Sequence, residues 1–125
     1  MAYRSAVRAE YDVALQFPGH PGHSGRMHGH RYVVEAVLEC ETLDEHGFGI
    51  DFDVVQPRLA AIASELDHRV LNELPPFRDR APSAEHQAEY FYRRLSGALA
   101  EEGSEMRLVK VRVTQEPDAW AEYEP

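Results

Sequence analysis

Two long stretches in which apolar and polar residues alternate limit most strongly what this chain can fold into. In residues 7–17 the odd positions are apolar, and in residues 32–40 the even positions are apolar. A period of two puts every second side chain on the same face of a β-strand. We therefore predict one strand over residues 7–17 and another over 28–40, joined as a hairpin by a loop over 18–27 that is rich in Gly, Pro and His.

The middle of the chain carries two stretches with apolar residues at helical spacing. Asp53 is a candidate N-cap for the first helix, which we expect to end before Asn72. Ser83 is a candidate N-cap for the second helix, and Gly103 can stop it. The pair Pro75-Pro76 predicts an irregular connection between the two helices.

A third strand is predicted over residues 107–115, where Val109, Val111 and Val113 alternate with polar residues, and a short fourth strand over 120–123. The predicted order is ββααββ. This is an α+β fold, an antiparallel sheet with two helices on one face. At 125 residues, we expect a single domain over residues 1–125.

Charge and cysteine content exclude several kinds of partner. The net charge of −9 argues against nucleic acid and anionic membrane surfaces. Cys40 is the only cysteine, so no internal disulfide forms, and no stretch reaches the roughly 20 apolar residues that span a bilayer. We expect a cytoplasmic protein. Strands this long in a small sheet also favour edge pairing into a homo-oligomer, although charges on the outer face argue the reverse.

Residues 19–30 hold four histidines, His20, His23, His28 and His30, together with four glycines. His28 and His30 lie two residues apart on the predicted strand, so both rings project from the face that is buried further along it. Two imidazoles placed in this way can converge on one zinc ion. The alternative is that these are histidines of an ordinary surface loop.

Five blocks of sequence carry a resemblance to a known family. They are HGHRYVVEAVLE, GIDFDVV, LDHRVLN, APSAEH and TQEPDAWAEY. In this order and approximate spacing, between Tyr11 and Tyr123, the chain resembles the 6-pyruvoyl-tetrahydropterin synthase / 6-carboxy-tetrahydropterin synthase (QueD-like) family. The resemblance implies the tunnelling fold, in which trimers close their sheets into a barrel, two trimers stack, and active sites lie at subunit boundaries. It also implies zinc and a pterin-like small-molecule substrate.

The resemblance assigns two of three zinc ligands directly, as His28 and His30. The third ligand of the family lies on the first strand, at a position that here is Leu15, and leucine cannot ligate a metal. Either His20 or His23 replaces it from the loop, or the metal has been lost and Leu15 joins the apolar face. If both loop histidines bind, the site is closed, as in structural zinc sites.

The family's catalytic cysteine lies four residues before the HGH block, where this chain has Ser24. A hydroxyl is much harder to ionise than a thiol, so Ser24 is a poor base and a better hydrogen-bonding or loop residue. The usual proton abstraction by a thiolate therefore cannot occur here.

The remaining family residues are present. Asp67 and His68 match the pair that works as a proton relay, although a polar helix C-terminus would look the same. Glu116 matches the glutamate that anchors the guanidine-like edge of the pterin. Ser83 and Glu85 match residues near the same pocket, and each can equally be a helix-capping residue.

The function that the resemblance implies is a zinc-dependent lyase or cyclase acting on a reduced pterin or a related heterocycle. The missing cysteine and the missing histidine leave two alternatives open. One is a divergent enzyme acting on a non-pterin metabolite in specialised biosynthesis, and the other is a non-catalytic binding subunit.

Overall fold

The two alternating stretches form long antiparallel strands, as predicted. A computed structural model describes residues 1–101 and 106–125. β1 (Tyr3–Leu15) and β2 (His28–Cys40) pair along their whole length, with Tyr3 opposite Cys40 and Leu15 opposite His28. β1 therefore begins and ends earlier than the predicted 7–17. It ends at Leu15 because the backbone N–H of Phe17 turns to the carbonyl of Ser24 to close the loop.

The sheet has five strands in the order β3-β1-β2-β4-β5. β4 (Arg107–Glu116) pairs with β2, and β5 (Ala119–Tyr123) pairs with β4, both antiparallel and close to the predicted ranges. β3 (Arg69–Val70) pairs parallel to β1 and was not predicted. Two residues are too few to produce a detectable period.

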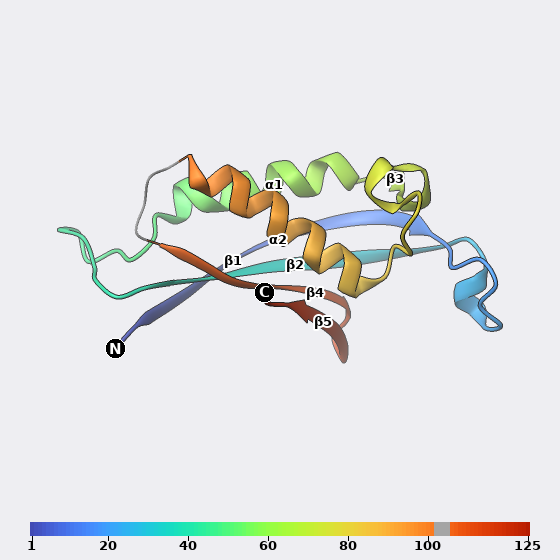
Figure 1. Cartoon of the computed structure of the whole chain (residues 1–125), viewed down its shortest axis with the longest axis horizontal. Helices are drawn as coiled ribbons and strands as arrows, with labels where there is room; N and C mark the ends of the chain where they lie inside the picture. Colours follow the sequence, from blue (N-terminus) through green and yellow to red (C-terminus); the bar gives the residue numbers. More distant parts are fainter. Residues whose placement is uncertain (102–105) are drawn as a thin grey trace.

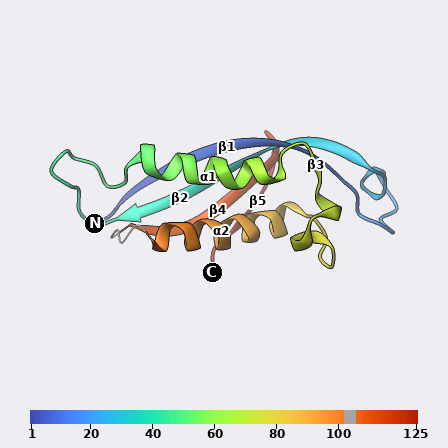
Figure 2. The ribbon, with the colours of Figure 1, turned by 90° about the horizontal axis from the view of Figure 1, so that it is seen from above.

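Two helices cover one face of the sheet (Figures 1 and 2). α1 (Phe52–Leu66) is capped by Asp51, whose carboxylate accepts the backbone N–H of Asp53, so the predicted cap at Asp53 is wrong by two residues. α1 stops at Leu66, where the chain turns sharply toward β3.

α2 (Ala84–Ala100) is capped by Ser83, as predicted. The predicted stop at Gly103 lies outside the described residues. Between the helices, short 3-10 turns at Leu71–Glu73 and Pro75–Phe77 form the irregular connection that the proline pair indicated.

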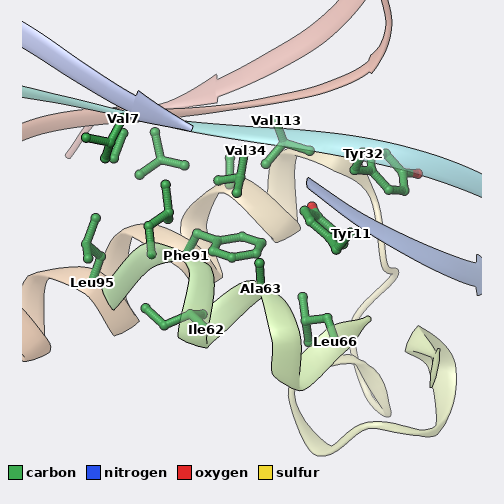
Figure 3. Packing of buried hydrophobic residues seen from close by; sticks show 14 of the residues in the cluster. Val7, Tyr11, Tyr32, Val34, Ile62, Ala63, Leu66, Phe91, Leu95 and Val113 are labelled. Carbon is green, nitrogen blue, oxygen red and sulfur yellow. The ribbon is translucent and has the colours of Figure 1, made fainter. Parts of the chain in front are cut away.

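The core fills the space between the sheet and the helices. Figure 3 shows Phe91 of α2 in the middle of this cluster, with Tyr11 on the sheet side and Ala63 on α1. Most of the predicted inward residues are buried, including Leu15, Cys40 and the three valines of β4. Ala9, Phe17 and Ala98 are only partly buried. Each fully buried aliphatic side chain contributes roughly 1.5–3 kcal/mol, so this layer supplies most of the stabilisation.

The other face of the sheet carries no helix of the described residues and is strongly charged. Glu39 lies between Arg4 and Arg107, and Glu122 lies between Lys110 and Arg112. These carboxylates each join two or more strands. Separately, none of the helices in the described part of the chain is long and apolar enough to cross a membrane.

Candidate active site

The histidine loop is folded tightly enough to fix where β2 begins. The Phe17 N–H donates to the Ser24 carbonyl at 2.8 Å, and the His20 N–H donates to the Phe17 carbonyl at 3.0 Å. A side chain at Gly25 would put its Cβ 2.3 Å from the carbonyl oxygen of His20. Only glycine fits there, so Gly25 is what allows the loop to fold back on itself.

His28 and His30 lie side by side on the helix-facing side of β2. Their ring centroids are 5.0 Å apart and nearly perpendicular. His28 lies against Phe17, and His30 lies against Tyr32, whose ring is buried. The predicted common face of the two histidines is therefore present.

Both rings turn their Nδ1 atoms toward protein oxygens. His28 Nδ1 lies 2.7 Å from the Arg26 carbonyl, which can only accept, so Nδ1 carries the hydrogen and Nε2 keeps its lone pair. His30 Nδ1 lies 3.7 Å from a carboxylate oxygen of Glu116. Metal-binding histidines in proteins characteristically present one nitrogen in this way while the other faces a carbonyl or carboxylate.

The surroundings of His30 favour its neutral imidazole form. Burial, followed by the neighbouring His28, lowers the pKa of His30, and Glu116 offsets part of that shift. A neutral imidazole has the lone pair that a metal requires. The donor set that these two residues offer therefore fits zinc, with two nitrogen ligands from one strand.

The two loop histidines do not join this pair in the structure. His20 turns its Nδ1 to accept the backbone N–H of Gly22 at 3.0 Å, and His23 is exposed beside a 300 Å³ hollow lined by Pro21, Gly22 and Arg26. Leu15, opposite His28, is fully buried in the core. A third ligand from His20 or His23 stays a prediction.

Asp67 and His68 form an ion pair directly after α1. One Asp67 oxygen lies 2.9 Å from His68 Nδ1, and the other accepts the Asp12 N–H at 2.7 Å. The His68 N–H in turn donates to the Asp12 carbonyl at 2.6 Å, which holds His68 at a φ of 59°. A non-glycine residue in this left-handed region is uncommon and costs free energy, so the contacts with β1 maintain it.

Asp12 completes a cluster that sequence reasoning missed. Within the described residues, Asp12, Asp67 and His68 form the only group of three or more potential metal ligands with donor atoms inside 4.8 Å of one another. Arg31 already donates to both oxygens of Asp12, at 2.9 and 3.0 Å, and this contact lowers the pKa of Asp12. The positively charged guanidinium of Arg31 occupies the position beside Asp12 that a metal ion would need. We therefore interpret the cluster as a set of contacts that hold His68 in place.

Within the described residues of one chain, Asp67 and His68 do not contact His28 or His30. Asp12 and Arg31 lie on the charged face of the sheet, because they alternate with the buried residues of β1 and β2. His28 and His30 share the opposite face with Tyr32. In the described part of the chain, no hydrogen bond, ion pair or ring contact joins the two groups.

Glu116 lies beside His30, whereas the two other predicted pocket residues lie elsewhere. Ser83 Oγ accepts the His86 N–H at 3.2 Å as a helix cap, and Glu85 is exposed in the first turn of α2. Ser24 sits in the 3-10 turn His23–Gly25 and contributes its backbone carbonyl to the loop.

A cavity of about 460 Å³ does not coincide with this chemistry. It lies at the opposite end of the sheet, in the loop after β2, where Cys40, Phe48, Ile50 and Met106 are among its lining residues. This cavity contains no histidine. The histidine pair lies at the other end of the sheet, where β2 begins.

Comparison with known proteins agrees with the fold. The family model for 6-pyruvoyl tetrahydropterin synthase matches residues 5–125. The chain is 30% identical over 118 residues to a 6-carboxy-5,6,7,8-tetrahydropterin synthase of Aquifex aeolicus, which covers 78% of this chain and 73% of that protein. It is 28% identical over 108 residues to the protein of the same name from Bacillus subtilis, covering 83% and 72%.

Among solved structures, the 6-pyruvoyl tetrahydropterin synthase of Caenorhabditis elegans superposes with a TM-score of 0.86 at 19% identity, over 100% of this chain and 96% of that one. That likeness concerns the fold, a five-stranded sheet with two helices on one face, as expected for the tunnelling fold. The match over nearly all residues decides the family. The chain belongs to the 6-pyruvoyl tetrahydropterin synthase family.

Proposed function

We propose that this protein is a zinc-dependent lyase or cyclase that acts on a reduced pterin. The observation that carries the proposal is the grouping of His28, His30 and Glu116 at one strand end, with both Nδ1 atoms facing protein oxygens. The tetrahydropterin synthases among its relatives support the same class of substrate.

Each of these residues has a separate task. His28 and His30 hold the metal through Nε2, and Glu116 accepts two N–H groups from the guanidine-like edge of the pterin. When bound, zinc polarises an oxygen of the substrate side chain. His68 accepts or returns a proton through the ring nitrogen that Asp67 does not contact, and Asp67 orients the ring and stabilises its cation.

A second copy of the chain brings the relay to the histidine pair. Asp67 and His68 lie beside Asp12 at the edge of the sheet and do not contact His28 or His30 in the described residues, so one active site needs Asp67 and His68 from a neighbouring subunit. We propose a homo-oligomer, a trimer or a hexamer, with sites at the subunit boundaries. Edge pairing between sheets is the ordinary way for long strands to become covered.

Two departures from the family pattern shape the chemistry. Ser24 replaces the cysteine base, so we assign Ser24 a hydrogen-bonding role and leave proton movement to His68. Leu15 replaces a metal ligand, so the third ligand comes from His20 or His23. The same departures favour the second candidate, a different reaction of a pterin-like or other metabolite in the same pocket.

The test is incubation of the zinc-loaded protein with dihydroneopterin triphosphate, followed by chromatography of the pterin products. Turnover that is lost in His68→Asn and Glu116→Gln supports the proposal. Turnover that rises in Ser24→Cys identifies the family reaction, because a thiolate base is restored. Binding without turnover, abolished by Glu116→Gln, identifies a binding subunit. If neither binding nor turnover occurs, the pterin proposal is wrong.

A further inference from the structure

The cavity in the loop after β2 is separate from the histidine pair and from the relay. Its volume is about 460 Å³, and its lining residues come from the end of β2, the loop 41–50 and the start of α1. In Figure 1 this loop and the histidine loop lie at opposite ends of the sheet. Small-molecule sites in proteins commonly have volumes of this order. The cavity is therefore large enough for a ligand that does not compete at His28 and His30.

Hydrogen bonds within the loop fix the shape of this cavity. The Asp44 carboxylate accepts the backbone N–H groups of His46 and Phe48 at 2.8 and 2.9 Å, and the Asp44 N–H donates to the Phe48 carbonyl at 2.9 Å. A Cβ atom at Gly49 would overlap the sulfur of Cys40, so glycine is what lets the loop pack against the end of β2. A site whose walls are already held in place loses less conformational freedom when a ligand binds.

The walls of the cavity are largely apolar. Six of its ten lining residues are apolar: Cys40, Leu43, Phe48, Ile50, Val54 and Met106. Leu43 and Phe48 are also exposed, at 40% and 54% of their surface. A ligand with an apolar body would remove part of this surface from water, which favours binding.

The charged residues of the lining are all acidic. Asp44 and Asp51 line the cavity, and no Lys, Arg or His does. One oxygen of each carboxylate accepts backbone N–H groups, and neither carboxylate has an ion pair within the described residues. His46, on the same loop, lies against Glu45 instead. The N–H of Phe48 lowers the pKa of Asp44, so this carboxyl is ionised at neutral pH. The cavity therefore carries negative charge without a counter-charge.

The donor atoms of the cavity do not converge on a single metal ion. Cys40, Asp44 and Asp51 are not a trio with donor atoms inside 4.8 Å of one another, a condition that only the cluster at Asp12 meets in the described part of the chain. Metal ligands surround their ion at about 2.0–2.6 Å. The complementary cation is thus an organic one, in which a charged nitrogen and a carbon skeleton occupy different parts of the cavity.

We propose that this cavity is a binding site for a small organic ammonium compound. Its apolar or aromatic body lies against Leu43 and Phe48, and its nitrogen faces Asp44 and Asp51. The face of the Phe48 ring attracts a cation as well. The net charge of −9 raises the concentration of cations near the protein. The site is independent of the proposed pterin chemistry, and the ligand binds without zinc.

The experiment titrates the full-length ¹⁵N-labelled protein with three compounds of similar size and follows the backbone amide signals by NMR. The compounds are 2-phenylethylamine, which is cationic, 2-phenylethanol, which is neutral, and 3-phenylpropionate, which is anionic. The amine is expected to shift the signals of residues 42–54 and to bind about fivefold more tightly than the alcohol, the effect of one partly exposed ion pair. The anion is expected to bind more weakly than the alcohol.

Substitutions separate the charge from the apolar wall. Asp51→Asn keeps an N-cap for α1, because asparagine caps as well as aspartate, and should reduce the preference for the amine over the alcohol. Asp44→Asn should do the same. Phe48→Ala should weaken the amine and the alcohol alike, by about fivefold, because it removes part of the wall. Asp53→Asn, the same change two residues along and outside the cavity, should bind all three compounds as the wild-type protein does.

Three results would overturn the proposal. Signals of residues 42–54 that do not move at millimolar amine would show that the cavity is not a site for this class of compound. Equal affinity for the three compounds, or a full preference for the amine in both Asp44→Asn and Asp51→Asn, would show that the carboxylates do not select a cation. A zinc affinity that falls when the amine is present would show that the amine binds at His28 and His30 instead.

Discussion

At the scale of single residues, Leu15 decides how many ligands the first two strands offer a metal. Leu15 lies directly across the ladder from His28, on the same face of the sheet, and is fully buried. The family resemblance places a histidine at that position. The first two strands of this chain therefore supply two histidines, one fewer than the family resemblance implies.

Leu15→His should restore a three-histidine site. Without metal, we expect a loss of about 2–4 kcal/mol of unfolding free energy, because a polar ring replaces a buried leucine. Zinc at a hundred times its dissociation constant should return about 2.7 kcal/mol. Thermal unfolding with and without zinc measures both effects. Val7→His, on the same buried face of β1 but opposite Ala36, is the matched control and should gain nothing from zinc.

The sequence predicts the histidine pair but not its surroundings. The common face of His28 and His30 follows from strand alternation, because both are in phase with the buried Tyr32. The contact of Asp12 with Asp67 could not be predicted, since it depends on how the chain returns to β1 after α1. Gln87 left a weak signal, a polar residue in the same helical stripe as Phe91 and Leu95, but its partners, the Tyr11 hydroxyl and the Pro82 carbonyl, lie on two other segments.

At the scale of elements, substitutions of Ser83 can distinguish a role in capping α2 from a role in binding substrate. Ser83→Ala should lower the unfolding free energy by about 1 kcal/mol, because the His86 N–H loses its acceptor. Ser83→Asp keeps an acceptor and should restore stability. Chemical denaturation measures the change, and Asp51→Ala, the cap of α1, is the control. A loss of pterin affinity in Ser83→Asp at full stability would show that the hydroxyl also contacts substrate.

The charged face of the sheet should make stability depend on pH. Hydrogen bonds from Arg4 and then Arg107 lower the pKa of Glu39 below its ordinary value of 4.5. The ionised form is therefore favoured by folding, and this stabilisation is complete above the ordinary pKa and is lost as pH falls through the lowered one.

The midpoint of urea unfolding should thus differ between the wild-type protein and Glu39→Gln at pH 6, and the difference should shrink below pH 4.5. Glu41→Gln serves as the control, because Glu41 is exposed and has no ion pair within the described residues. A difference that stays constant through this range would mean that Glu39 acts through packing instead of charge.

The existence of the long strands followed from sequence, but the boundaries of β1 did not. The paired strands were predicted because alternation continues for about ten residues in each. β1 starts earlier than expected because its first residues are held by pairing with the end of β2, which no local pattern reports. β3 and the bulge in β4 depend on single residues and on neighbouring strands, so they became visible only in the folded structure.

At the scale of the whole molecule, the proposed active site divides between subunits, and mixing experiments can detect this. His28→Ala and His68→Ala should each be inactive alone. If the two variants are unfolded together and refolded as mixed oligomers, about a quarter of the sites should regain both intact groups, since each group comes from an independent subunit. Turnover measured after mixing checks this. No recovery would place both groups in one chain.

The claim on which the account depends most is that His28 and His30 hold one zinc ion. Isothermal titration of the metal-free protein with zinc tests it directly. We expect one ion per chain in the wild-type protein and in His46→Ala, an exposed histidine at the opposite end of the sheet. Binding should be lost in His28→Ala and in His30→Ala. The account would be contradicted by a wild-type protein that binds no zinc, or by His28→Ala and His30→Ala variants that bind it as tightly as the wild-type protein.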